Sequence, residues 1–143
     1  MNLIGRRQVH QAFSKLCKSC CQKKRKVFFW LLLKDHISTK ELLRRKTMEL
    51  DNYNCVLCDL ASEESLVHLF MACPFARSCW ETLGLVIYQP SDPFGALVSF
   101  KNQLQLPFFM EIIVTMSWSI WTVHNDAIFQ QVQPSIDHCK AVF

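Results

Sequence analysis

The stretch CVLCDLASEESLVHLFMACP, from Cys55 to Pro74, places three cysteines and one histidine close together in the sequence. They are Cys55, Cys58, His68 and Cys73, and their spacing is C-x2-C-x9-H-x4-C. Thiolate sulfur and imidazole nitrogen are the usual ligands of structural zinc, and a C-x2-C pair can point both sulfurs at one ion from a single turn. The spacing therefore predicts one Zn²⁺ per chain, held by these four residues.

The number of ligands predicts what the zinc does. Four protein ligands complete a tetrahedral shell, whereas a catalytic zinc keeps one position open for water or substrate. We therefore expect a structural site, whose chelation unfolds residues 51–83 before a helix at 108–129. The alternative is that these residues are ordinary buried thiols and a core histidine, which would be the default interpretation of any one of them alone. Their combined spacing favours the metal.

The other cysteines do not complete a second site. Cys17, Cys20 and Cys21 form another C-x2-C, but they have too few histidines at ligand spacing. Cys79 and Cys139 are isolated and have no base nearby in the sequence, so neither is expected to be a nucleophile. Three glycines cannot build a phosphate-binding loop. We therefore predict that the chain is not an enzyme.

The first 30 residues lack a signal peptide, which favours reduced thiols in an intracellular compartment.

The composition favours a mainly α fold, a small helical domain around one zinc knuckle with a buried C-terminal helix. Half of the 143 residues are apolar, while 3 Gly and 5 Pro provide too few turns for a β-sandwich. The patterns predict helices at 27–33, at 39–48 after a Ser38-x-x-Glu41 capping box, around His68 after Ser62, from Pro74 to near Gly84, and at 108–129. The apolar part of the last helix is too short to span a membrane.

Four segments are expected along the chain. Residues 1–22 are interpreted as a basic, loosely ordered lead-in, and residues 23–88 as the zinc-binding domain. Residues 89–107 contain three of the five prolines and are interpreted as a linker. Residues 108–143 form the C-terminal helical segment.

Positive charge is concentrated in the first part of the chain. Residues 1–50 carry a net charge of +10, and residues 51–143 carry −6. Two clusters could contact the phosphates of RNA or DNA weakly and without sequence preference. They consist of Lys23, Lys24, Arg25 and Lys26, and of Arg44, Arg45 and Lys46. The alternative is that both clusters are solvated faces, and the second lies where cations complement the end of a helix dipole.

Three stretches resemble one known family. They are KRKVFFWLLLKDHISTKELLRRKTM (Lys24–Met48), CVLC with EESLVHLFMACPFARSCW (Glu63–Trp80), and WSIWTVHNDAIF (Trp118–Phe129). Over roughly residues 20–143 the chain resembles the zinc-binding domain that follows the reverse transcriptase in plant non-LTR retrotransposons. Positions of matching type are Trp30, Leu42, Leu43, Cys55, Cys58, Glu64, His68, Leu69, Phe70, Cys73, Pro74, Phe75 and Trp80. His36 and His124 stand where that family usually or often has Arg, which argues against polyanion contact at those two positions.

The resemblance implies a fragment detached from its polymerase and from any downstream ribonuclease H domain. Two functions are consistent with it. The first is a zinc-stabilised module that contacts nucleic acid. The second is a structural spacer that packs against reverse transcriptase or another protein. A relic without a selected function is also consistent. The first two differ in whether the basic clusters share one face.

Overall fold

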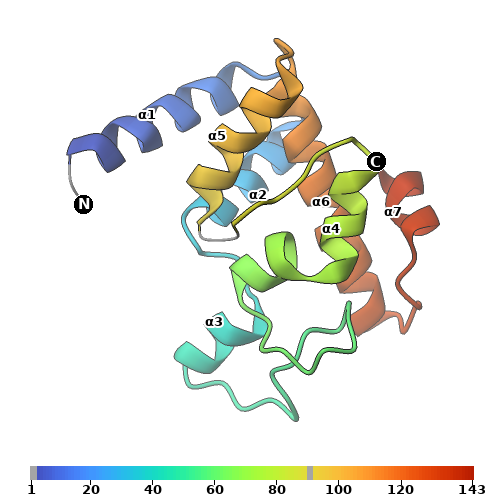
Figure 1. The fold of residues 1–143 in the computed structure, drawn as a ribbon. Coiled ribbons are helices and arrows are strands. Elements are labelled where there is room, and N and C mark those ends of the chain that lie inside the picture. Colours follow the sequence, from blue (N-terminus) through green and yellow to red (C-terminus); the bar gives the residue numbers. More distant parts are fainter. Residues whose placement is uncertain (1–2, 90–91) are drawn as a thin grey trace.

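A computed structural model describes residues 3–89 and 92–143. The helical elements in this part of the chain are α1 (Leu3–Lys18), α2 (Lys23–Leu33), α3 (Lys40–Arg45), the π-helix η1 (His68–Ala72), α4 (Pro74–Glu81), α5 (Pro93–Leu104), α6 (Phe109–Phe129) and α7 (Ile136–Val142) (Figure 1). The described residues contain no strand longer than one isolated antiparallel bridge, between Asn54 and Glu63. The predicted mainly α fold class is confirmed.

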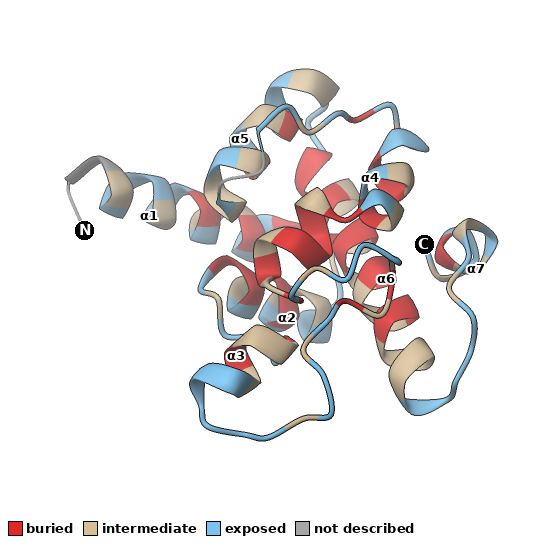
Figure 2. Ribbon diagram, turned by 60° about the horizontal axis from the view of Figure 1, so that its bottom comes forward, coloured by how far each residue is buried: buried red, intermediate tan, exposed pale blue. Residues whose placement is uncertain are grey.

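Helix α6 is the centre of the fold, because α2, α4, α5 and α7 all pack against it. Its buried face includes Ile113, Met116, Ile120 and Val123, which follow the alternating spacing of three and four that predicted this helix. Burial of each large aliphatic side chain contributes about 1.5–3 kcal/mol. Figure 2 shows the buried residues gathered on α6 and on the helices around it.

Aromatic contacts join α6 to α2 and to η1, which lies within the cysteine motif. The Phe28 ring on α2 meets Trp118 edge-on, with 5.3 Å between ring centroids. The Phe70 ring on η1 stacks on Trp121 at 6.3 Å. Contacts of this kind add about 0.5–1.5 kcal/mol beyond the area that they bury. The metal-ligand segment is therefore attached directly to the central helix.

Two predicted N-caps are wrong, the first by one residue and the second by three. Thr39, not Ser38, caps α3, because its side-chain oxygen accepts a hydrogen bond from the Leu42 amide at 3.2 Å. Helix α3 also ends at Arg45, earlier than predicted. Ser65, not Ser62, supports the turn that leads to His68, whose amide donates to the Ser65 hydroxyl at 3.1 Å. In both places the sequence offers neighbouring hydroxyl residues, and only the path of the backbone selects one.

The predictions around Pro74 and Gly84 are confirmed. Pro74 is the first residue of α4, where its missing N–H removes no helical hydrogen bond. Helix α4 ends at Glu81, and Gly84 follows with a φ of +74°, in the left-handed region that glycine adopts without strain.

Two segments are more ordered than predicted. The lead-in at 1–22 contains α1, which buries Ala12 and Leu16 against the core. The linker at 89–107 contains the 12-residue helix α5, capped by the Asp92 carboxylate, which accepts from the Gly95 amide at 2.8 Å. Pro93 begins a helix here instead of interrupting one, so the segment has more helical structure than the sequence indicated. The division into four segments remains a prediction.

None of the helices in the described ranges combines the length and the apolar character needed to cross a bilayer.

Candidate metal centre

The four predicted ligands converge on one point. The sulfur atoms of Cys55, Cys58 and Cys73 and a ring nitrogen of His68 all lie within 4.8 Å of one another. The distance between the Cys55 and Cys73 Sγ atoms is 4.0 Å, and Cys58 Sγ lies 3.3 Å from His68 Nε2. Zinc–sulfur bonds of about 2.3 Å at tetrahedral angles place two sulfurs about 3.8 Å apart. The cluster therefore has the dimensions of a tetrahedral zinc site.

A tight turn supplies the first two ligands. The Leu57 amide donates to Cys55 Sγ at 3.4 Å, which directs an N–H dipole at a sulfur that must carry negative charge when it binds metal. The Cys55 amide donates to the Ser62 carbonyl at 2.9 Å and closes the loop that carries Cys58. The bridge between Asn54 and Glu63 lies directly beside this bond. Backbone pairing therefore holds the two ends of this turn together beside Cys55.

The π-helical turn explains the spacing of the last two ligands. Residues five apart on an α-helix point about 140° away from each other, so His68 and Cys73 could not share a face of a regular helix. In η1 the Cys73 amide instead donates to the His68 carbonyl at 2.7 Å, an i to i+5 bond that widens the turn. This wider turn places the two side chains on the same side. The sequence predicted the ligands but not this element.

The electrostatics of the cluster favour a bound cation. The thiol of Cys55 donates to Cys73, and this contact together with burial raises the pKa of Cys55 well above its usual range. Burial also raises the pKa of the Cys58 thiol. The Cys55 hydrogen bond and the backbone amides of Ala76 and Phe75, at the start of α4, lower the pKa of Cys73. Because the thiols of Cys55 and Cys58 are harder to ionise here, a cation bound between the three sulfurs would offset the cost of their ionisation.

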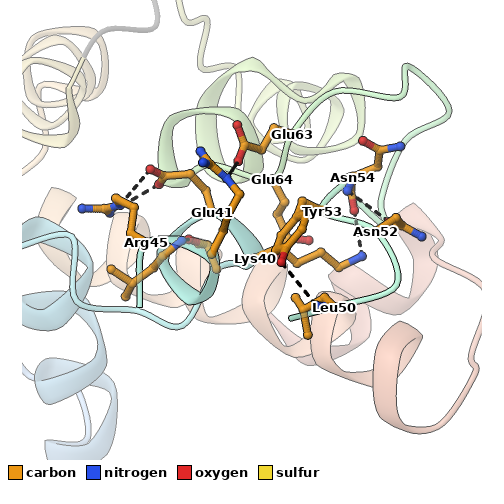
Figure 3. A network of polar contacts seen from close by, with 12 residues as sticks. Lys40, Glu41, Arg45, Leu50, Asn52, Tyr53, Asn54, Glu63 and Glu64 are labelled. Carbon is orange, nitrogen blue, oxygen red and sulfur yellow. Dashed lines mark hydrogen bonds and ion pairs between the residues drawn. The ribbon is translucent and has the colours of Figure 1, made fainter. Parts of the chain in front are cut away.

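Glu64 connects the metal-ligand loop to α3 and α6. Its carboxylate is fully buried, and Oε1 accepts from the Lys40 amide at 3.1 Å and lies 3.0 Å from Nε2 of His124. The two atoms lie at contact distance without forming a hydrogen bond. The Glu64 amide donates to the Tyr53 carbonyl at 2.8 Å, and its carbonyl accepts from the Glu41 amide at 3.0 Å. Figure 3 shows Glu64 in the polar network that includes Lys40, Glu41 and Tyr53.

The sequence did not predict this role. Glu63 and Glu64 follow Ser62, where the sequence predicted the start of a helix, but neither residue is helical. Glu63 lies in the bridge and pairs with the Arg44 guanidinium at 2.6 Å. The signal that could have identified Glu64 is its matching type in the resemblance, together with His124 at a position where that family often has a cation. Position 124 is buried, 2 % exposed, so it faces Glu64 and not solvent.

The second predicted basic cluster is occupied by contacts within the chain. Arg44 pairs with Glu63, and Arg45 lies 2.7 Å from Asp35 and 2.8 Å from Glu41. Lys46 is exposed. The acidic partners reduce the charge that this cluster offers to a polyanion.

The first basic cluster, in the first turn of α2, is more available to a polyanion than the second cluster is. Lys23 and Lys24 are exposed, and Lys24 and Arg25 lie over the Trp118 ring at 5.5 and 5.9 Å from its centroid. The Lys26 amine donates to the Cys17 carbonyl at 3.0 Å. Since Asp35 directly follows α2 and contacts Arg45, the two clusters are separated by about the length of this 11-residue helix, roughly 16 Å.

Two neighbouring surface hollows lie near the two clusters. One of about 310 Å³ is lined by Lys24 and Trp121, and the other of about 540 Å³ is lined by Arg45 and Lys46. Leu31 and His36 line both hollows. Each basic cluster therefore borders a hollow of its own beside α2.

The remaining cysteines lie apart from the cluster. Cys17 and Cys20 are exposed, and within the described ranges only the group at 55–73 could hold a metal ion. Cys79 and Cys139 are buried, and the Cys139 thiol contacts the Met116 sulfur at 3.7 Å. Both belong to the packed core.

One comparison with known proteins identifies the family. A family model described as zinc-binding in reverse transcriptase matches residues 2–80, which is more than half of the chain and includes all four ligands. No curated protein and no solved structure matches the chain. The fit of the ligand geometry agrees with the family description. The chain therefore belongs to the family of zinc-binding domains of reverse transcriptase.

Proposed function

We propose that the chain is a non-catalytic module that holds one structural Zn²⁺ through Cys55, Cys58, His68 and Cys73. The observation that carries this proposal is the convergence of three sulfurs and one ring nitrogen within 4.8 Å. Soft thiolates in a tetrahedral arrangement suit zinc better than magnesium or calcium, which prefer oxygen ligands. Four protein ligands also leave no position at which the ion could activate water.

The zinc stabilises a segment that has little structure of its own. Residues 46–65 contain no helix, and the segment's buried apolar side chains are few, chiefly Cys55 and Leu57. Metal binding to such a segment contributes roughly 10 kcal/mol or more to folding. The bound ion would then fix η1, and with it the Phe70 contact to α6.

The stoichiometry of zinc tests this proposal. We expect one zinc per chain in protein purified without chelator, measured by elemental analysis. Cys58→Ser should lose most of this zinc, because a hydroxyl is a much weaker zinc ligand than a thiolate. Cys20→Ser is the matched control, since Cys20 is exposed and outside the cluster. Zinc content near zero in the unmodified chain, or equal content in the two variants, would contradict the assignment.

We further propose that the module contacts the phosphates of RNA or DNA through the start of α2. Support comes from the exposed Lys23 and Lys24 and from the absence of an acidic residue in the first turn of this helix. Negative charge is favoured at that end by the helix dipole. The hollow along α2 adds Trp121 and Leu31, against which unpaired bases could stack.

Salt dependence measures this contact. Fluorescence anisotropy with single-stranded and duplex oligonucleotides should give binding that weakens as salt rises. Replacing Lys23 and Lys24 by Gln should reduce the log–log salt slope by about 1.4 for single strands and about 1.8 for duplex. Lys140→Gln, on α7, should leave the slope unchanged. The absence of binding at low salt, or an unchanged slope in the double variant, would remove nucleic acid as a partner.

A structural spacer is the second candidate, and the ion pairs of Arg44 and Arg45 favour it, because paired side chains are less free to bind phosphate. If the chain is a spacer, the two hollows beside α2 pack against the polymerase of the parent protein. We propose a plant non-LTR retrotransposon as the origin of the chain, on the resemblance of its three quoted stretches. A relic of such an element would fold without binding either partner.

A further inference from the structure

Two lysines from different helices converge on one aromatic ring, away from the residues considered so far. The Lys15 amine, on α1, lies 5.3 Å from the centroid of the Phe109 ring, and the Lys101 amine, on α5, lies 5.9 Å from it. The neighbouring Lys101 side chain, together with burial, lowers the pKa of Lys15. Among the described residues, no carboxylate pairs with either amine.

The lysines border a cavity of about 240 Å³ between α1, α5 and the start of α6. Its apolar wall includes Ala12, Leu97 and Phe109. Amide side chains complete the polar side of the cavity, and none of its lining residues is acidic. These amides belong to Gln8, Gln11 and Asn102. The cavity thus has one apolar wall and one side rich in N–H donors.

Stabilisation of the fold does not explain why the amines of Lys15 and Lys101 both lie over the Phe109 ring. Each lysine lies in the last turn of its helix, where a cation is favoured by the dipole. That effect accounts for each charge separately, but not for two ammonium groups over one ring, because like charges at short range repel. Each contact with the ring contributes only about 0.5–1 kcal/mol at an exposed position. A bound anion would turn the repulsion into attraction.

We propose that Lys15 and Lys101 bind the phosphate of a nucleotide whose base lies against the apolar wall of this cavity. Two ammonium groups and three amides offer enough donors for the several oxygens of a phosphate. The apolar wall adds a surface for a planar base, with which aromatic rings such as Phe109 stack. Inorganic phosphate alone would leave this wall uncovered.

This site is distinct from the phosphate contact proposed at the start of α2. The lysines of α2 approach Trp118, whereas this pair approaches Phe109, nine residues earlier on α6 and about 13 Å away along the helix. The site at Phe109 needs to hold only one nucleotide, whereas the contact at α2 involves a longer strand. A mononucleotide can therefore test it even if the contact at α2 does not exist.

Titration of the full, zinc-loaded chain with small ligands is the first test. Adenosine monophosphate should bind, measured by calorimetry and by shifts of the Phe109 ring resonances. Inorganic phosphate should bind at least about tenfold more weakly, and adenosine should not bind detectably. An oligoadenylate that competes for the same resonances would identify a nucleotide within a strand as the ligand, and one that does not compete would identify the free nucleotide. Adenosine binding as tightly as the monophosphate would overturn the proposal.

Matched charge variants provide the second test. Lys15→Gln combined with Lys101→Gln should weaken monophosphate binding at least about tenfold, since hydrogen bonds to charged groups are lost. The control, Lys18→Gln combined with Lys140→Gln, removes the same charge from exposed positions outside the cavity. Without ligand, the first variant should melt no lower than the unmodified chain, because repulsion is relieved. Equal affinity of the two double variants would overturn the site.

Discussion

At the scale of single residues, the metal ligands and Glu64 differ in how far the sequence reveals them. Ligand spacing is a local pattern, because the chemistry of zinc restricts both the residue types and their separation. The partner of Glu64 is 60 positions away, at His124. Nothing near Glu64 in the sequence indicates a buried carboxylate, so its role required the three-dimensional fold.

Replacement of Glu64 should be far more costly than replacement of its neighbour. Glu64→Ala should lower the free energy of unfolding by about 3–5 kcal/mol, because it leaves the buried His124 and the Lys40 amide without their partner. Glu63→Ala is the matched control and should cost at most about 1 kcal/mol, since its pair with Arg44 is exposed. Urea denaturation of zinc-loaded protein measures both. Similar losses in the two variants would contradict the assigned role.

At the scale of elements, helices with a sustained apolar face could be predicted, and those without one could not. Helix α6 has five turns of regular spacing, so its bounds were predicted within one residue. Among residues 5–18 of α1, the buried apolar side chains are Ala12 and Leu16, which is too weak a period to recognise. Helix α5 begins at Pro93, and proline indicates a helix start only when the preceding cap is also recognised.

The cap of α3 provides a test between sequence and structure. Thr39→Val keeps the shape of the side chain but removes the oxygen that accepts from the Leu42 amide. It should lower the free energy of unfolding by about 0.5–2 kcal/mol. Ser38→Ala should change stability by less than about 0.5 kcal/mol, because Ser38 is exposed and is not the cap. Thermal melting of both variants decides it, and a larger effect at Ser38 would restore the capping box that the sequence predicted.

The π-helical turn η1 shows a limit of prediction at this scale. The sequence HLFMA is compatible with a regular helix, and no local residue demands the wider turn. The need comes from the metal ligands at both of its ends, which must face one ion. The spacing H-x4-C therefore carried more structural information than the helical propensity of the residues between its two ends.

At the scale of the whole molecule, the chain combines a helical core with a segment that carries the four candidate metal ligands. The core consists of α2, α5 and α6 with α4 and α7 beside them, and its apolar residues form one continuous cluster. The segment at 46–73 joins this core through the Phe70 ring and the Glu64 carboxylate. Metal removal should therefore unfold the segment at 46–73 before it unfolds the helical core.

Chelation should open residues 51–73 first and leave α2 and α6 protected. The sequence alone predicted opening of residues 51–83, but α4 has its own contacts with the core, including Trp80 against Phe100 at 4.6 Å between ring centroids. The loop before it has few backbone hydrogen bonds apart from those of Cys55 and Glu64, so chelation removes the ion that would hold its four ligands together.

Hydrogen exchange with and without chelator measures this order directly. The amides of Cys55 and Glu64, which donate across the loop, should lose protection at chelator concentrations that leave the amides of Ile120 and Val123 unchanged. Renewed protection after zinc is added back would exclude irreversible damage. If the amides of α6 were exposed together with those of the loop, the ion would support the whole core. If no amide changed, the zinc would not be structural, because a closed site of this kind contributes its binding energy to the fold that it holds.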